Sequence, residues 1–443
     1  MNKNSIFFAI PGALVISFMV QGFSPRNPEE TRRIPLEDFF RNPEQSAYQI
    51  SPNGKFFSFM APYQRRMNVF VQEIGGEGIL RLTNDTLRDI AGYAWAGNDR
   101  ILYLNDTGGD ENYKLYVVDV DGKNLKALTD FEGVRTTFID PLVDEPDEVI
   151  IGLNKRNAMV FDPYRLNIIT GELTMLAENP GNIQGWMTDH DGKLRVAIAI
   201  VDGVNQSLLY RDTEDEEFRS VLTVSFKETL SPLLFTFDNK NVYAASNLNR
   251  DKAALVEFDI SNGKEIKELY ENPDYDISNL AHSRKRKIIT SASYTSWKRE
   301  RHFFDKETRK LFDFLYKKLK GYELGITSMS KEEDRMIIRT YKDRSLGAYY
   351  LFDKNTKELT KIAELGTWFS EDELASMTPV QYKSRDGLTI NGYLTLPAGY
   401  SLKTAKNLPV VINPHDVFLL TTSYFHLGAV WELAVQTANS QFQ

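Results

Sequence analysis

The sequence of 443 residues contains no cysteine and only five histidines. The absence of cysteine excludes disulfides, thiolate nucleophiles and cysteine-based metal sites. The histidines form no i, i+4 pair and no H-E-x-x-H motif, so we expect no metal site. They are His190, His282, His302, His415 and His426. Basic residues are fewer than acidic ones: 53 Lys and Arg against 61 Asp and Glu give a net charge of −8. Nucleic acid is therefore not expected as a partner.

Long apolar runs are scarce, and the longest stands near the N-terminus. It extends from Ile6 to Val20 and follows Lys3, and Val20-Gln21-Gly22 has small or apolar residues where a signal peptidase reads. A helix of this length is about 22 Å long, shorter than the roughly 30 Å of a bilayer core. We therefore expect residues 1–22 to be a secretory signal and the mature protein to be periplasmic or secreted, without a membrane segment. A buried helix or an uncleaved anchor is the alternative.

A repeat with a period near 46 residues runs through most of the chain. In its first register a polar turn precedes a β-rich run, as Ser51–Lys55 precedes Phe56–Phe59. The markers of these turns lie 44, 48, 46, 47, 46 and 48 residues apart. They are Gly54, Asn98, Pro146, Gly192, Asn239, Lys285 and Glu333. Such regular spacing indicates a repeated supersecondary unit.

A second register consists of a strand, a tight turn and another strand, as in residues 115–129. Its other turns lie 20 to 22 residues after the markers and are rich in residues that accept positive φ. They centre on Ile74, Ile168, Asp212, Asp259, Asp305 and Asp353. With short aromatic-containing runs before the first turns, each unit is expected to have four strands. Seven units predict an all-β, seven-bladed β-propeller over residues 46–366 with contiguous blades; a large β-sandwich is the alternative.

The rhythm of the sequence changes after residue 366. Ser370 and Glu373 fit an S-x-x-E capping box, which predicts a short helix ended by Pro379. Runs on both sides of Arg385-Asp386-Gly387 predict a hairpin, and the apolar run Pro409–Ile412 predicts a buried strand. Residues 367–415 are therefore expected to form the first strands of an incomplete α/β domain.

Four segments in this region resemble the prolyl oligopeptidase family of serine peptidases, most closely its bacterial exported dipeptidyl-peptidase and acylaminoacyl-peptidase branch. They are Met377–Val380, Ser384–Gly387, Gly392–Pro397 and Leu408–His415. The resemblance covers about residues 34–415. It implies a propeller that admits short peptides to an α/β-hydrolase domain with a Ser-Asp-His triad and no cofactor. It also implies that residues 23–45 pack on that domain.

The sequence departs from the family pattern at His415, which stands where the family's oxyanion loop begins. Family members continue with Gly-Gly-Pro, whereas this chain continues with Asp416–Leu419. No G-x-S-x-G nucleophile elbow occurs in the 443 residues, so no catalytic residue is assigned. We expect a truncated, inactive form in which residues 416–443 are a divergent tail. The alternative is a natural ending, in which residues 426–435 form a helix that covers the last strand.

One further part of the resemblance is Gly108-Gly109-Asp110-Glu111-Asn112, in a loop of a blade. The carboxylates of Asp110 and Glu111 could receive the ammonium group of a peptide substrate. The alternative is a structural turn, in which Asp110 or Asn112 bonds nearby backbone N–H groups. Two functions remain. The chain is either the gate of a serine peptidase without its catalytic residues, or a non-catalytic exported propeller that binds peptides or partner proteins.

Overall fold

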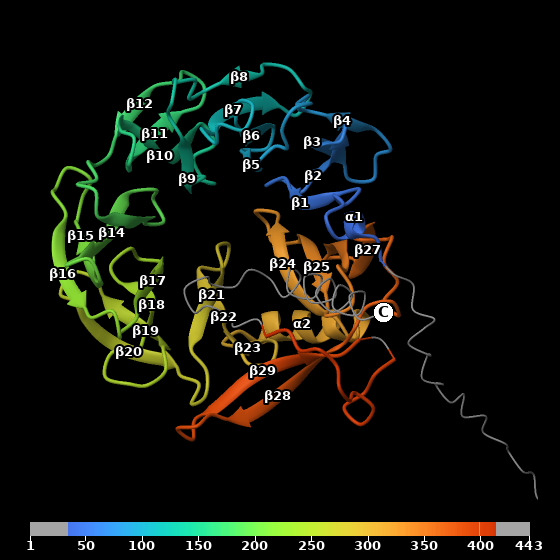
Figure 1. The fold of residues 1–443 in the computed structure, drawn as a ribbon. Helices are drawn as coiled ribbons and strands as arrows, with labels where there is room; N and C mark the ends of the chain where they lie inside the picture. The colour runs from blue at the N-terminus through green and yellow to red at the C-terminus, as the bar shows by residue number, and fades with distance from the viewer. Residues whose placement is uncertain (1–33, 398, 413–443) are drawn as a thin grey trace, which may run out of the picture.

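The computed structural model describes residues 34–397 and 399–412. In this part of the chain the predicted seven-bladed propeller is confirmed, because seven antiparallel sheets follow one another around a ring (Figure 1). The expected signal segment, His415 and the tail after it lie outside the described residues.

The strands of each blade are consecutive in the chain. Blade 1 contains β1 (Ser46–Ile50), β2 (Phe56–Tyr63), β3 (Arg66–Glu73) and β4 (Ile79–Arg81). Blade 2 contains β5 (Gly92–Ala96), β6 (Arg100–Asn105), β7 (Lys114–Asp119) and β8 (Lys126–Ala127). Blade 3 contains β9 (Thr136–Asp140), β10 (Glu148–Asn157), β11 (Val160–Asn167) and β12 (Leu173–Met175). Blade 4 contains β13 (Ile183–Thr188), β14 (Leu194–Val201), β15 (Asn205–Tyr210) and β16 (Arg219–Val224).

The remaining blades continue in the same way. Blade 5 contains β17 (Leu230–Phe235), β18 (Val242–Ser246), β19 (Ala254–Asp259) and β20 (Lys264–Tyr270). Blade 6 contains β21 (Ile277–Ser283), β22 (Ile288–Thr295) and β23 (Arg299–Phe303). Blade 7 contains β24 (Glu323–Met329), β25 (Arg335–Tyr341), β26 (Ala348–Asp353) and β27 (Glu358–Glu364). First strands such as β9 and β24 lie toward the centre of the ring, and β12 and β16 lie at its rim (Figure 1).

The ring closes between blades 1 and 7 without a shared strand, as expected. Hydrogen bonds join the two blades: Ile50 N to Ser328 Oγ at 3.0 Å, Ala47 N to the Tyr349 hydroxyl at 3.2 Å, Lys331 N to Pro52 O at 2.7 Å, and Arg335 Nη1 to Gly54 O at 2.6 Å. The closure therefore depends on contacts between blades and not on one continuous sheet.

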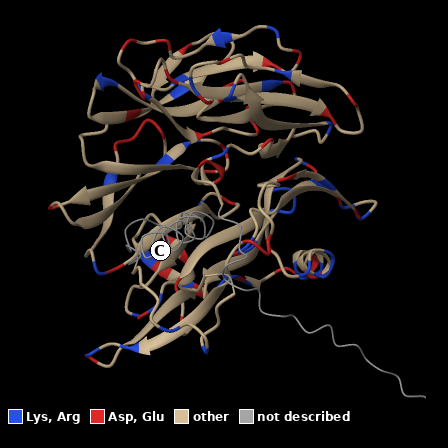
Figure 2. Ribbon diagram, turned by 45° about the vertical axis from the view of Figure 1, so that its right-hand side comes forward, with Lys and Arg blue, Asp and Glu red and all other residues tan. Residues whose placement is uncertain are grey.

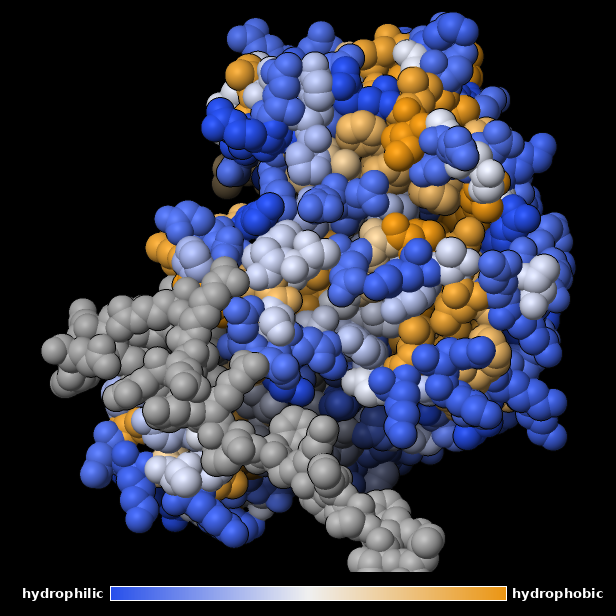
Figure 3. Space-filling view, turned by 90° about the vertical axis from the view of Figure 1, so that its right-hand side faces the viewer, coloured by the Kyte–Doolittle hydropathy of each residue, from blue (hydrophilic) through white to orange (hydrophobic). Residues whose placement is uncertain are grey.

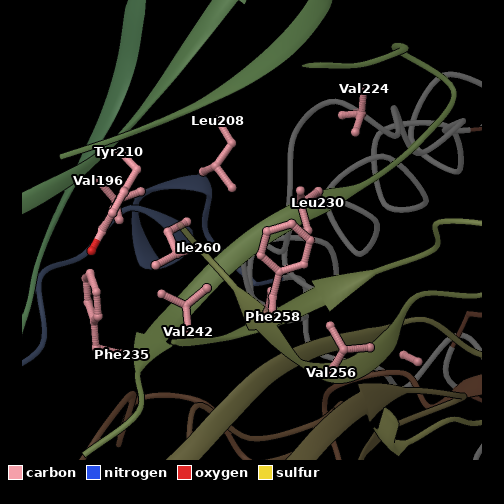
Figure 4. Close-up of a cluster of buried hydrophobic side chains, with 12 residues drawn as sticks. Val196, Leu208, Tyr210, Val224, Leu230, Phe235, Val242, Val256, Phe258 and Ile260 are labelled. Atoms are coloured by element: carbon pink, nitrogen blue, oxygen red, sulfur yellow. The ribbon is translucent and has the colours of Figure 1, made fainter. Parts of the chain in front are cut away.

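The core lies between adjacent blades. Figure 4 shows the cluster between blades 4 and 5, where apolar side chains of the two sheets meet. Phe258, Val242 and Val256 are fully buried in it. Strands buried on both faces need apolar residues at successive positions. This explains the apolar runs that follow the first-register turns in the sequence.

Blade 6 departs from the prediction of four strands. After β23 the chain forms helix α2 (Lys306–Lys318), so Asp305 caps a helix and does not lie in a hairpin turn. The side chain of Asp305 accepts a hydrogen bond from Thr308 N at 2.8 Å. Phe312 and Leu315 are buried and lie on one face of the helix. Apolar residues at this spacing favour a helix here, although the repeat predicts a hairpin turn at Asp305.

This cap makes stability depend on pH. Hydrogen bonds from Arg286 and Thr308 hold the pKa of Asp305 well below its ordinary value. A depressed pKa stabilises the fold above the unfolded pKa, near 4, and the contribution is lost as pH falls toward the folded value. We expect Asp305→Ala to lower the free energy of unfolding by about 1–2 kcal/mol at pH 7. In urea titrations this difference should shrink below about pH 4.

The matched control is Asp305→Asn, which keeps a side chain that caps helices well and removes only the charge. At pH 7 its stability should lie between those of the parent and of Asp305→Ala, because it keeps a cap but loses the charge beside Arg286. Its difference from Asp305→Ala should not change on acidification, since neither side chain titrates. A difference between parent and Asp305→Ala that is constant from pH 7 to pH 3 would contradict the role of the charge.

Two expectations for the segment after the ring are wrong. Ser370 N does donate to Glu373 Oε2 at 2.8 Å, as in a capping box, but only a turn follows. No helix forms because Met377 and Pro379 already belong to β28 (Met377–Lys383), where pairing and the restriction on the residue before proline require extended backbone.

The apolar run at residues 409–412 forms no strand and is not buried. Val410 is 80% exposed and Ile412 is 83% exposed. In the described part of the chain no strand pairs with this run, so no sheet covers its side chains. The predicted hairpin is confirmed, since β28 pairs antiparallel with β29 (Thr389–Thr395). Among the described residues, no helix has the length and apolar character needed to span a bilayer.

Candidate functional site

One face of the ring carries the segments that follow it. Successive strands of a blade are antiparallel, so the turns between second and third strands share a face with the connections between blades. The hairpin β28–β29 lies against this face: Met377 N donates to Asp343 Oδ2 at 3.1 Å, and the Tyr393 hydroxyl donates to the carbonyl of Trp297. Both partners lie in turns between second and third strands. We call this side the hairpin face.

The segment before the ring also reaches this region. Helix α1 (Leu36–Phe39) contacts residues just after β27: Trp368 Nε1 donates to Asp38 O at 2.9 Å, and the rings of Phe39 and Phe369 are 5.6 Å apart. The segment before the ring is therefore joined to the segment that follows it. The expected packing of residues 23–45 on a hydrolase domain stays a prediction, because this contact is with the segment that leaves the ring.

An ion pair fixes the path of that segment. Glu371 contacts Lys342 Nζ at 2.5 Å and accepts a hydrogen bond from the Tyr322 hydroxyl at 2.6 Å. Burial, together with the neighbouring Glu371, raises the pKa of Tyr322 to about 12, so the tyrosine remains a hydrogen-bond donor at neutral pH. Residues that leave the ring are thus anchored to blade 7 before β28 begins.

The loop between β6 and β7 lies on the same face and contains both carboxylates that the sequence singled out. Asp110 Oδ1 accepts hydrogen bonds from Thr107 N at 3.2 Å and Asn112 N at 3.1 Å, and its Oδ2 accepts one from Asn112 Nδ2 at 3.3 Å. Partial loss of hydration acts to raise its pKa, but these donors outweigh it and the pKa lies below its ordinary value. Asp110 therefore shapes its own loop.

Glu111 differs from its neighbour. Its side chain is exposed, and with the described residues its carboxylate makes no hydrogen bond or ion pair. Its φ of 57° is in the left-handed region, which a residue with a side chain rarely adopts. The conformation is held by Asp106, whose Oδ2 accepts a hydrogen bond from Glu111 N at 3.2 Å. Such a constraint on an exposed acid is typical of functional loops.

Sequence reasoning missed the residues that support this loop. The side chain of Asp106 is only 1% exposed and pairs with Arg88, whose Nε lies 3.2 Å from Asp106 Oδ1. Asp85 accepts hydrogen bonds from Arg88 N at 2.6 Å and Asn105 Nδ2 at 2.7 Å. A polar pair at the end of β6 was the available signal, but no spacing rule links it to the connection before β5.

Other sites considered from the sequence are outside the structure or without support in it. His415 lies outside the described residues. In the described part of the chain no three His, Asp or Glu side chains are placed to hold a metal ion. Figure 2 shows both signs of charge interspersed along the strands and loops, without a face of one sign in that view. In Figure 3 apolar side chains form patches that hydrophilic side chains interrupt.

The ring and its hairpin define the class of fold, that of prolyl oligopeptidase propellers. One structure from an analysis of two prolyl endopeptidases aligns with TM-score 0.56 at 12% identity, covering 80% of this chain and 55% of that chain. Puromycin hydrolase aligns with TM-score 0.56 at 12% identity, covering 83% of this chain and 61% of the hydrolase chain. Prolyl oligopeptidase B from Galerina marginata aligns with TM-score 0.55 at 12% identity, covering 80% and 56%. At this identity the likeness shows the fold.

Curated relatives carry the assignment further, although no family model matches the chain. Dipeptidyl aminopeptidase BIII of Pseudoxanthomonas mexicana is 28% identical over 411 residues, which are 90% of this chain and 58% of the relative. Dipeptidyl peptidase family member 6 of Caenorhabditis elegans is 22% identical over 397 residues, which are 85% of this chain and 53% of the relative. The chain is a relative of the prolyl oligopeptidase family, as its motifs indicated. It spans somewhat more than half of each curated relative.

Proposed function

We propose that these 443 residues are the peptide-gating propeller of an exported prolyl oligopeptidase-family peptidase and hydrolyse no peptide bond by themselves. The observation that carries the proposal is the attachment of β28–β29 to the hairpin face, next to a propeller of the family type. The exposed Val410 and Ile412 support it, because in the family fold such a run is covered by further strands. No nucleophile elbow occurs in the sequence.

Glu111 is proposed as the residue that receives the N-terminal ammonium group of a peptide. Its carboxylate is exposed on the hairpin face and is not used by its own loop, whereas that of Asp110 is. The held backbone of Glu111 limits the region that its carboxylate can reach, so little backbone entropy is lost on binding. A positive charge on the ligand makes the hydrogen bond stronger than a neutral one.

The proposal is tested by peptide binding and by active-site labelling. In calorimetric titrations a tripeptide with a free N-terminus should bind more tightly than its N-acetylated form. Glu111→Gln should weaken the free peptide about three- to tenfold and leave the acetylated peptide unchanged. A fluorophosphonate probe should label no serine of the 443 residues.

The matched control is Glu77→Gln, an exposed acid in the β3–β4 turn on the opposite face of the ring, which should bind both peptides like the parent. Equal loss of affinity in Glu77→Gln and Glu111→Gln would reject the specific role of Glu111. Stoichiometric labelling of a single serine would reject the absence of hydrolysis.

A further inference from the structure

An ion pair crosses the ring on the face opposite the hairpin face. There the turns between first and second strands surround the axis, and blade 3 has the longest, seven residues (141–147) against three to six elsewhere. Asp144 of this turn lies 2.8 Å from Lys331 Nζ, in the corresponding turn of blade 7. Blades 4 to 6 separate the two on one side and blades 1 and 2 on the other. The contact must therefore pass over the axis.

Charges from three turns meet at this point. Asp144 belongs to an acidic stretch of blade 3, and the basic stretch Arg284–Lys287 belongs to the turn of blade 6. The hydrogen bond from Lys331, with a further contribution from Arg284, lowers the pKa of Asp144. The turns of blades 3 and 7 thus attract each other across the ring axis, where propellers have a central channel.

The backbones that carry this pair are held by hydrogen bonds and by a buried side chain. Lys331 N donates to Pro52 O at 2.7 Å, which ties its turn to blade 1. In the blade 3 turn Leu142 is 5% exposed, and Leu142 O accepts a hydrogen bond from Glu145 N at 2.7 Å. Breaking the contact requires rotation of two side chains and no change of fold.

The ion pair is weak enough to break and re-form, and too weak to stabilise the closed ring. The side chains of Lys331 and Asp144 are 66% and 60% exposed. An ion pair with this exposure shifts an equilibrium by about two- to fivefold, which is too little to hold a ring together. It is also screened by salt.

We propose that Asp144 and Lys331 form a salt-sensitive gate across the mouth of the central channel, and that extended peptides pass this end only while the ion pair is broken. The inference rests on the proposed function for the nature of the ligand.

Access to the channel can be measured with a single cysteine, because the chain has none of its own. Thr327 is an exposed residue of β24, the strand of blade 7 that lies toward the centre of the ring (Figure 1). In a Thr327→Cys background, labelling by a maleimide attached to an extended peptide should be about two- to fivefold faster after D144K, which places a cation near Lys331 and Arg284. High salt should produce the same increase in the parent, and D144K/K331E should restore the slow rate.

The matched control is a pair on the same face that joins neighbours. Lys285 Nζ lies 2.7 Å from Glu332 Oε2 with similar exposure, but it links blades 6 and 7, so E332K should not change the labelling rate. Equal rates in D144K and its parent, with unchanged unfolding midpoints, would overturn the gate. The readout needs neither hydrolysis nor binding at Glu111, so it fails or succeeds independently of the proposed function.

Discussion

Replacing Phe258 with alanine should lower the free energy of unfolding by about 3–5 kcal/mol. The side chain is fully buried in β19, in the cluster between blades 4 and 5. Both sheets around it are held by strand pairing, so they cannot close on the cavity, and the cost includes lost contacts as well as lost burial. Urea unfolding followed by tryptophan fluorescence measures the change.

A phenylalanine between the same two blades provides the control. Phe226 lies in the connection from blade 4 to blade 5 and is 69% exposed. Phe226→Ala should change the free energy of unfolding by no more than about 0.5 kcal/mol. Similar losses in the two variants would mean that the interface between blades is not the source of stability.

Replacing Arg211 with methionine should cost about 2–4 kcal/mol through a different mechanism, the loss of donors to buried carbonyls. Arg211 is 4% exposed, and its guanidinium donates to the carbonyls of Leu194, Leu176, Glu214 and Glu216. Methionine keeps much of the length but leaves these oxygens without their donor. Burial lowers the pKa of Arg211, which indicates how little water replaces the lost bonds.

The control for this variant is Arg219→Met in the same blade. The side chain of Arg219 is 47% exposed and makes one ion pair with Asp212, at 3.5 Å. Its loss should stay within about 0.5 kcal/mol in the same urea titration. Arg211→Lys should fall between the two, since one ammonium can serve some of the carbonyls but not all. An Arg211→Met variant as stable as Arg219→Met would contradict the role of the carbonyl contacts.

The propeller could be predicted because its turn residues recur at a regular spacing along the sequence. Gly54 and Gly192 adopt the positive φ that their turns require, so the repeat appears in the sequence without any knowledge of contacts. The repeat does not predict helix α2, because Asp305 has the spacing of a hairpin turn and only the helical spacing of Phe312 and Leu315 indicates otherwise. Residues 409–412 were misjudged because an apolar run indicates burial only when other strands cover it.

The candidate site was less accessible to sequence reasoning. The motif around Asp110 and Glu111 did not reveal which acid is free, since this depends on hydrogen bonds within the loop. The pairing of Arg88 with Asp106, and of Asp144 with Lys331, depends on how the blades curve around the ring. Contacts between residues 18 or 187 positions apart leave no periodic signal in the chain.

The contiguity of the blades has a consequence for the gene. Each described sheet is one uninterrupted stretch of chain, and the ring closes without borrowing a strand from its other end. Duplicating or deleting one stretch of coding sequence would therefore add or remove a whole blade without cutting any other. A ring closed by a shared strand has no such freedom at its junction. The number of blades is thus a property that recombination can change in whole units, with the contacts between Ile50 and Ser328 re-formed at the new seam.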